Sequence, residues 1–506
     1  MGVDASGEAR ASTSSFRPLH AIATLGGIQA LTMLAGLART KALAVMLGPD
    51  GVGVASVIDQ VVALVAQLGS LSIPFVGLKF LARARDGEPD EARRIYDALV
   101  RVLAIASVIA AALGTAIAAA QPTTFGDGLA SYRTVLIVAL IGVPPFAMAP
   151  LLRNALAALE RHRESAVAAF LGAVLTVSGA IVGVMTGGLV GLYIANAIVL
   201  VLTVAGLQWY LGRTLELRVT RDTSRAAIGR ALRSQPGVFG FAAAMYVLAL
   251  TSPFAYLLAR SLLLSHHGAV EAGLVAAAYG IAVSIRLVLN QANGLYLTPL
   301  VNRATAKSER IAAVADYLRI LVIVVVTSTM LVVLFPRQWI TVLYSKEFLE
   351  AVPLVMVFVL GEAILLIAGV YQALLIGFDD ISGFLVGAVG GHLVTIVLAA
   401  VLVVADGGVG VGVAFLAGNS VILVATAVRL LRAHAARQVF APLLPVAVAM
   451  AAVAVAGWWT AATEPSILFR VAGFIVTCAF AFLFLRPDER RWMLRPWQRS
   501  TSPRPQ

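Results

Sequence analysis

Charged residues are scarce in this chain. Asp, Glu, Lys and Arg make up 13% of its 506 residues, apolar residues make up 60%, and the mean hydropathy is +0.92. This composition excludes an ordinary water-soluble domain. The single cysteine, Cys478, excludes an intramolecular disulfide and a metal or redox cluster built from thiols. No Gly-x-x-x-x-Gly-Lys-Ser/Thr run occurs, so we expect no nucleotide hydrolysis and no bound cofactor.

Long apolar stretches take the place of the missing charges. A helix needs roughly 20 apolar residues to cross the ~30 Å hydrocarbon core of a bilayer, and such stretches recur throughout the chain. The sequence therefore predicts an all-α, polytopic membrane protein with about 14 transmembrane helices. The predicted spans are 20–46, 53–78, 101–120, 134–155, 165–186, 190–211, 237–263, 271–301, 314–335, 351–376, 382–404, 410–428, 439–459 and 467–485.

The basic residues, which give a formal net charge of +12, are distributed unevenly between these spans. The predicted outer loops contain only Arg133, Arg337 and Lys346, whereas most of the other Lys and Arg residues lie in segments on the side of the two termini. The positive-inside rule then predicts that both termini are cytoplasmic. No soluble segment could present these residues to nucleic acid, so we expect membrane lipids as their partners and no nucleic-acid partner.

Two halves of the sequence resemble each other. Leu37–Thr40 recurs as Leu258–Ser261, 221 residues later, and Gly191 has a counterpart at the same offset in Gly412. An even number of spans separates the copies, which predicts two six-helix lobes in a pseudo-twofold parallel repeat, followed by two C-terminal helices. Chance similarity in a chain rich in Ala, Gly and Val is the alternative. The expected segments are a disordered cytoplasmic tail at 1–19, an N-lobe at 20–211, a cytoplasmic linker at 212–236, a C-lobe at 237–437, an additional helix pair at 438–486 and a cytoplasmic tail at 487–506.

The run from Arg39 to Gly53, RTKALAVMLGPDGVG, resembles the first-helix signature of the Wzx-type flippases of O-antigen and common-antigen lipid-linked oligosaccharides. This group belongs to the multidrug/oligosaccharidyl-lipid/polysaccharide (MOP) exporter superfamily. The resemblance extends in order over roughly residues 20–437. The further stretches that carry it are Ala255–Arg260, Glu271–Gly273, Tyr296–Leu300, Leu343–Phe348 and Gly407–Gly410.

The resemblance implies a function in surface polysaccharide biosynthesis. It implies two helical bundles around a central cavity, which move a polyprenyl-pyrophosphate-linked glycan by alternating access from the cytoplasmic to the outer leaflet of a bacterial inner membrane. It further implies a monomer that works beside a polysaccharide polymerase and assembly proteins, and that is not itself an enzyme. Two departures leave the branch open: Asp59 stands where the common-antigen branch has a basic residue before the match to Gln60, and the two C-terminal spans are similar to those of lipid II flippases.

Intramembrane cations are the candidate substrate-binding residues. A pyrophosphate cannot cross hydrocarbon uncompensated, and arginine donates bidentate hydrogen bonds to phosphate while it keeps its charge. Arg39 and Lys41 point about 160° apart on a helix, and the sequence does not decide which of them faces the cavity. The alternative to a cavity-facing position, for these two residues and for Arg260, is that the side chain snorkels to the lipid headgroups. The expected substrate-binding residues are Arg39, Lys41, Arg260, Arg286 and Asn290.

Two intramembrane carboxylates, Asp59 and Glu362, are the candidate coupling or gating residues. As functional groups they are expected to bind a coupling ion, Na⁺ or H⁺, or to latch the lobes by pairing with an arginine in one state only. As structural groups they are expected to pair permanently with Arg39 or Arg260. No metal site is expected.

Three other function classes stay open. A small-molecule or drug antiporter of the same superfamily is the first alternative, although a cavity rich in arginine favours anionic cargo. A membrane-embedded glycan polymerase or glycosyltransferase would need catalytic residues on a sizeable loop, and the longest segment outside the spans, 212–236, is short. A non-transporting scaffold for assembly factors is the third.

Overall fold

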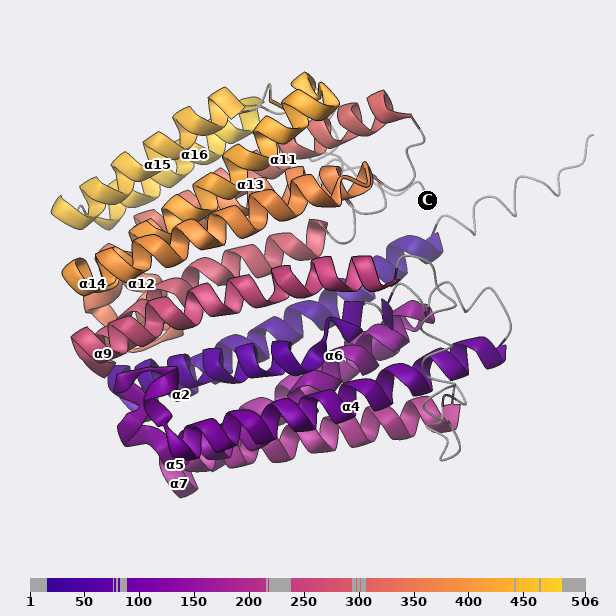
Figure 1. Cartoon of the computed structure of the whole chain (residues 1–506). Coiled ribbons are helices and arrows are strands. Elements are labelled where there is room, and N and C mark those ends of the chain that lie inside the picture. Colours follow the sequence, from indigo (N-terminus) through magenta and orange to yellow (C-terminus); the bar gives the residue numbers. More distant parts are fainter. Residues whose placement is uncertain are drawn as a thin grey trace, which may run out of the picture. The chain divides into compact units, whose positions relative to one another are not determined.

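The structure is a computed structural model that describes residues 16–75, 77–78, 81, 89–214, 217, 238–293, 297, 301, 306–440, 443–463 and 466–484. All regular structure in these ranges is helical (Figure 1). Most of the expected tail at 1–19, most of the expected linker at 212–236 and the whole expected tail at 487–506 lie outside them. The elements in chain order are α2 (Phe16–Ser70), α4 (Pro89–Ala120), η1 (Pro122–Phe125), η2 (Asp127–Tyr132), α5 (Arg133–Ile141), α6 (Val143–Ala158), α7 (His162–Thr214), α9 (Val238–Ala292), α11 (Lys307–Leu334), α12 (Pro336–Leu343), η4 (Lys346–Ala351), α13 (Val352–Gly377), α14 (Ile381–His434), η5 (Arg437–Phe440), α15 (Leu443–Thr463) and α16 (Ile467–Phe484).

Eight stretches of the described chain are helical, long and apolar enough to cross a membrane. Four of them, in α2, α7, α9 and α14, belong to helices of 53 to 55 residues that are interrupted by a non-helical glycine. A continuous helix of that length would measure about 80 Å, far more than a bilayer core, so each comprises two arms that cross separately. With the arms counted separately, and with α15 and α16 added, the described chain has the expected fourteen spans. The predicted all-α, multi-pass membrane fold is confirmed.

The interrupting glycines repeat along the chain in position and in backbone conformation. Gly48 (φ 66°, ψ −177°) matches Gly268 (φ 87°, ψ 178°). Gly188 (φ 55°, ψ −136°) matches Gly407 (φ 55°, ψ −128°). Positive φ with such ψ values is a region that glycine alone adopts readily. Because both pairs recur at nearly the offset of the sequence repeat, the backbone supports a true internal repeat over chance similarity.

The arms of α7 and of α14 touch through glycine. A Cβ atom at Gly183 would lie 2.4 Å from the carbonyl oxygen of Gly191 on the opposite arm of α7. In α14, a Cβ atom at Gly391 would lie 2.6 Å from the carbonyl oxygen of Gly418. Side chains are excluded at these positions, so the backbones approach closely, as in membrane helices whose interfaces contain small residues.

One predicted span differs in detail. The stretch 134–155 is divided at Gly142 into α5 and α6. Pro144 and Pro145 lie in the first turn of α6, directly after this break, where the amide hydrogens have no partner within the helix and proline is tolerated.

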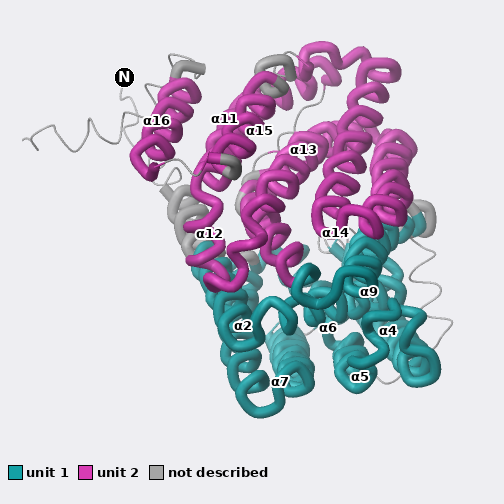
Figure 2. Tube along the Cα trace, turned by 90° about the vertical axis from the view of Figure 1, so that its left-hand side faces the viewer, with its two compact units in different colours: residues 1–272 teal, residues 273–506 magenta. Residues whose placement is uncertain are grey.

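The chain forms two compact units, residues 1–272 and 273–506, which divide within α9 (Figure 2). In unit 1, α2 packs against α4, α6 and α7; in unit 2, α13 packs against α14, and α11 against α15 and α16. The units follow packing and not the sequence repeat, so the lobe boundary expected at 212–236 stays a prediction. Large apolar side chains are exposed on both units, among them Met185 (74%) and Leu468 (74%), as expected for surfaces that face lipid.

Candidate functional site

Unit 1 contains a group of charged and polar side chains that we call the Asp59 cluster: Arg39, Asp59, Tyr193 and Arg260. Helix α2 contributes Arg39 from the arm before Gly48 and Asp59 from the arm after it. Tyr193 comes from the second arm of α7, and Arg260 from the first arm of α9. Three helices that are distant in sequence therefore bring two guanidinium groups, a carboxylate and a phenol together.

Tyr193 positions the Asp59 carboxylate. The buried Tyr193 hydroxyl lies 2.9 Å from Oδ1 of Asp59 and 3.0 Å from the carbonyl oxygen of Ala55. Ala55 and Asp59 are one helical turn apart and lie on the same face of α2. The single phenolic proton is therefore shared between two acceptors on one face, and Asp59 is held by a fixed donor from α7.

Arg260 is only 7% exposed, although it carries a permanent charge. Its Nη1 donates a hydrogen bond of 3.3 Å to the carbonyl oxygen of Ser56, which lies three residues before Asp59 on α2. A buried cation requires hydrogen bonds and a counter-charge, and both come from this face of α2. The sequence-based alternative of snorkelling to headgroups does not hold for Arg260.

Arg39 differs from Arg260 in having an unused donor. Both arginines act electrostatically on Asp59, but the buried Nε of Arg39 has no hydrogen-bond partner among the residues that the structure describes. Two guanidinium groups act electrostatically on one carboxylate, so the cluster has a formal charge of +1. Arg39 and Arg260 are also the two mates of the sequence repeat, which means that the repeat delivers both of its arginines to the same carboxylate.

Lys41 lies outside the Asp59 cluster. Its side chain is half-buried, and it is not among the charged neighbours of Asp59. Because it lies two residues after Arg39, it points to another side of α2. The two candidates thus lie in different surroundings, and the substrate-binding role of each stays a prediction.

Unit 2 contains a buried ion pair between Arg286 on α9 and Glu362 on α13. Nε of Arg286 lies 2.5 Å from Oε2 of Glu362, and the two side chains are 27% and 4% exposed. The expectation that Glu362 would pair with Arg39 or Arg260, if its role were structural, is wrong: its partner is Arg286. The pair is formally neutral, so Arg286 carries less unbalanced charge than the sequence suggested.

Beside this pair, a short row of polar groups continues to the end of α9. Nδ2 of Asn293 donates to Oδ1 of Asn290 at 3.4 Å, and the Tyr317 hydroxyl of α11 donates to Oδ1 of Asn293. Asn290 is exposed. The predicted substrate-binding residue Asn290 therefore belongs to a row of neutral hydrogen-bonding groups in unit 2.

Comparison with known proteins identifies the fold of this chain. No family model matches the sequence, and no curated protein sequence matches it. Solved structures do match. The chain has the fold of the MOP transporters.

Three of these structures illustrate the likeness. An inward-facing multidrug-resistance MATE transporter of the MOP superfamily has a TM-score of 0.64 at 16% identity, over 83% of this chain and 95% of its own. The lipid II flippase MurJ in an inward closed conformation has a TM-score of 0.65 at 12% identity, over 91% of this chain and 97% of its own. A MOP superfamily transporter from Pyrococcus furiosus, described as having a binding pocket of reverse polarity, has a TM-score of 0.57 at 17% identity, over 82% of this chain and 94% of its own.

Two tyrosines of the site were not anticipated from the sequence. Tyr193 lies two residues after Gly191, within the repeat motif, and Tyr317 lies in the first half of α11. A tyrosine within an apolar helix usually finds a hydrogen-bond partner when it is buried. That rule marks both residues as polar contacts, but it does not say which helix supplies the acceptor.

Within the MOP fold, the Asp59 cluster is suited to an anion. A guanidinium group with a free donor, beside a second guanidinium group, binds phosphate or carboxylate oxygens through charge-assisted hydrogen bonds. The Arg286–Glu362 pair is formally neutral, and the coupling or gating role of Glu362 stays a prediction.

Proposed function

We propose that this chain is a flippase that moves a polyprenyl-pyrophosphate-linked oligosaccharide from the cytoplasmic to the outer leaflet of a bacterial inner membrane, by alternating access, for surface polysaccharide biosynthesis. The MOP fold, with its likeness to a lipid II flippase over 91% of the chain, and the motifs between Arg39 and Gly410 support it. In this proposal both termini are cytoplasmic, and the protein acts beside a polysaccharide polymerase and assembly proteins.

A single observation carries the proposal: the Asp59 cluster has more cationic than anionic groups, and Arg39 has a spare buried donor. A charged group within a membrane-spanning helix is costly and needs a partner. A pyrophosphate that enters the cluster would supply that partner, because its oxygens accept hydrogen bonds and offset the excess positive charge. The same excess would repel a cationic drug.

A drug or small-molecule antiporter is the second candidate, because MATE transporters share the fold. It would require the carboxylates to bind cations. Glu362 is paired with Arg286, and Asp59 is flanked by two arginines, so neither carboxylate presents an unbalanced negative charge. If the flippase uses a coupling ion, Na⁺ or H⁺, we assign it to Glu362, which gains a free carboxylate whenever the pair with Arg286 opens.

The experiment that tests this function is a deletion in the native host, complemented with wild-type or Arg39→Gln protein. We expect deletion to remove the surface glycan and to cause lipid-linked glycan to accumulate on the inner leaflet, with wild type restoring export and Arg39→Gln failing at equal membrane levels. Normal surface glycan with increased drug sensitivity would favour the antiporter. Accumulation of unpolymerised glycan on the outer leaflet would favour a polymerase.

A further inference from the structure

Helix α7 is a hairpin whose two arms touch at one end and separate at the other. Near the Gly187–Gly188 turn the backbones meet at Gly183 and Gly191. The arms are still in contact at Gly172, where a Cβ atom would lie 3.8 Å from the Thr203 side chain, whereas a Cβ atom at Gly206 would have nothing within 4 Å. The arms therefore form a wedge that opens beyond Gly172 and Thr203, toward His162 and Thr214.

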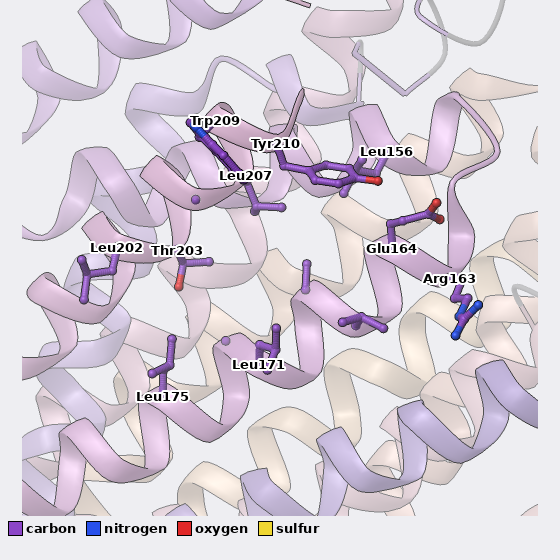
Figure 3. A pocket seen from close by; sticks show the side chains of 14 residues that line it. Leu156, Arg163, Glu164, Leu171, Leu175, Leu202, Thr203, Leu207, Trp209 and Tyr210 are labelled. Carbon is purple, nitrogen blue, oxygen red and sulfur yellow. The ribbon is translucent and has the colours of Figure 1, made fainter. Parts of the chain in front are cut away.

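The opening of this wedge is a cavity of about 530 Å³ between α7 and the end of α6 (Figure 3). Leucine and other apolar side chains line its length from both arms, including Leu171, Leu175 and Leu202. On the first arm the lining runs from Arg163 to Leu175, which corresponds to about 18 Å of helix rise. One leaflet of a bilayer core is about 15 Å deep, so the cavity has the depth of one leaflet.

The open end of the wedge carries groups typical of a membrane–water interface. Trp209 and Tyr210 lie at this end, with Trp209 62% exposed. The guanidinium carbon of Arg213 lies 5.4 Å from the centre of the Trp209 ring. Tryptophan and tyrosine mark the headgroup level, so the apolar part of the cavity lies at the depth of acyl chains.

The charge at this end is positive. The Glu164 carboxylate is 3.3 Å from Nη1 of Arg161 and is neutralised by it. Arg163, which lines the cavity, and Arg213 are both exposed, and they remain as cations at the headgroup level. Basic pockets between transmembrane helices bind the headgroups of anionic lipids.

We propose that this wedge binds an anionic phospholipid, with one acyl chain between the arms of α7 and the phosphate at Arg163 and Arg213. The lipid would come from the leaflet that contains the ends of α7. This site lies on α6 and α7 and does not involve the Asp59 cluster, so it holds independently of the transported cargo. A bound chain would lie in the cavity along both arms, past their contact at Gly172 and Thr203.

The test uses purified full-length protein, stripped of lipid and exposed to an equal mixture of phosphatidylglycerol and phosphatidylcholine, with bound lipid measured by native mass spectrometry. Wild type should retain phosphatidylglycerol preferentially. Gly206→Leu fills the wedge and should lose the bound lipid; the matched control, Gly390→Leu on α14, also enters open space and should bind as wild type does. Arg163→Gln should retain lipid but lose about fivefold of the preference for phosphatidylglycerol.

Three results would overturn the proposal. Gly206→Leu protein that binds phosphatidylglycerol as wild type does would place the lipid elsewhere, and equal binding of the two lipids by wild type would remove the role of the arginines. Displacement of phosphatidylglycerol by an equal concentration of a polyprenyl phosphate would instead assign the wedge to the tail of an isoprenoid lipid. If the Gly206→Leu protein does not fold, the preference of Arg163→Gln protein for phosphatidylglycerol tests the site on its own.

Discussion

The carboxylate of Glu362 on α13 meets the guanidinium of Arg286 on α9 at 2.5 Å, and of the two side chains only Arg286 has appreciable exposure. This difference in exposure determines how much stability the protein loses when one partner is removed and the other stays unpaired. A buried carboxylate without its counter-charge is strongly destabilising, whereas a partly exposed guanidinium can still be solvated.

Arg286→Gln should therefore destabilise the protein more than Glu362→Gln. We expect Arg286→Gln to lower the free energy of unfolding by about 1–3 kcal/mol. This loss is smaller than that for breaking a fully buried pair, because Arg286 is partly exposed. The double variant should be more stable than Arg286→Gln alone, since no unpaired charge remains. Thermal denaturation of the four proteins in detergent measures this, and a double variant whose loss equals the sum of the two single losses would show that the pair is not formed.

Asp380, in the turn between α13 and α14, should make stability depend on acid pH. Hydrogen bonds from Arg429 at 2.7 and 3.0 Å, with further ones from His434, the Gly383 amide and Ser382, hold the pKa of Asp380 well below its usual value. A depressed pKa in the folded state stabilises the protein above the unfolded value of about 4, and this contribution is lost as the pH falls below that value.

Asp380→Asn should consequently lower the denaturation midpoint at pH 7, because it removes the negative charge that Arg429 binds, whereas asparagine caps a helix about as well as aspartate does. The difference from wild type should shrink below pH 4. Asp379→Asn is the matched control, because Asp379 is exposed and its left-handed conformation (φ 57°) also suits asparagine. A difference that stays constant between pH 3 and pH 7 would contradict the assignment.

The glycine contact within α7 should be intolerant of a single methyl group. Gly183→Ala would place a Cβ atom 2.4 Å from the Gly191 carbonyl oxygen, and the backbones must separate at a cost of about 1–3 kcal/mol. Gly206→Ala, on the same hairpin, enters open space and should be neutral or slightly stabilising. Denaturation midpoints of the two variants give the comparison; equal midpoints would mean that the arms do not touch.

The sequence was sufficient for the membrane spans and for the repeat, because both depend on local properties. Long apolar stretches mark the spans, and glycine at the positions of Gly48 and Gly268 marks the breaks. The repeat also marked Arg39 and Arg260 as a related pair. What that relation means became clear only from the structure, in which both arginines act on Asp59.

The partners of buried side chains could not be predicted. Helical periodicity gives the face on which Glu362 lies, but not the helix that opposes this face, so Arg286 was not recognised as its partner. Tyr193 was missed for the same reason: its acceptor is 134 residues away in sequence, and no local pattern encodes that distance.

The most direct test of an anion path through the Asp59 cluster is leaflet transfer of a pyrophosphate-linked glycolipid in proteoliposomes, measured as the fraction that becomes accessible to an external glycosidase. Wild type should transfer the lipid, Arg39→Gln should lose at least about tenfold in rate because a charge-assisted phosphate contact is removed, and Lys41→Gln, on another side of the same helix, should transfer as wild type does. Transfer by Arg39→Gln at the wild-type rate would contradict the account.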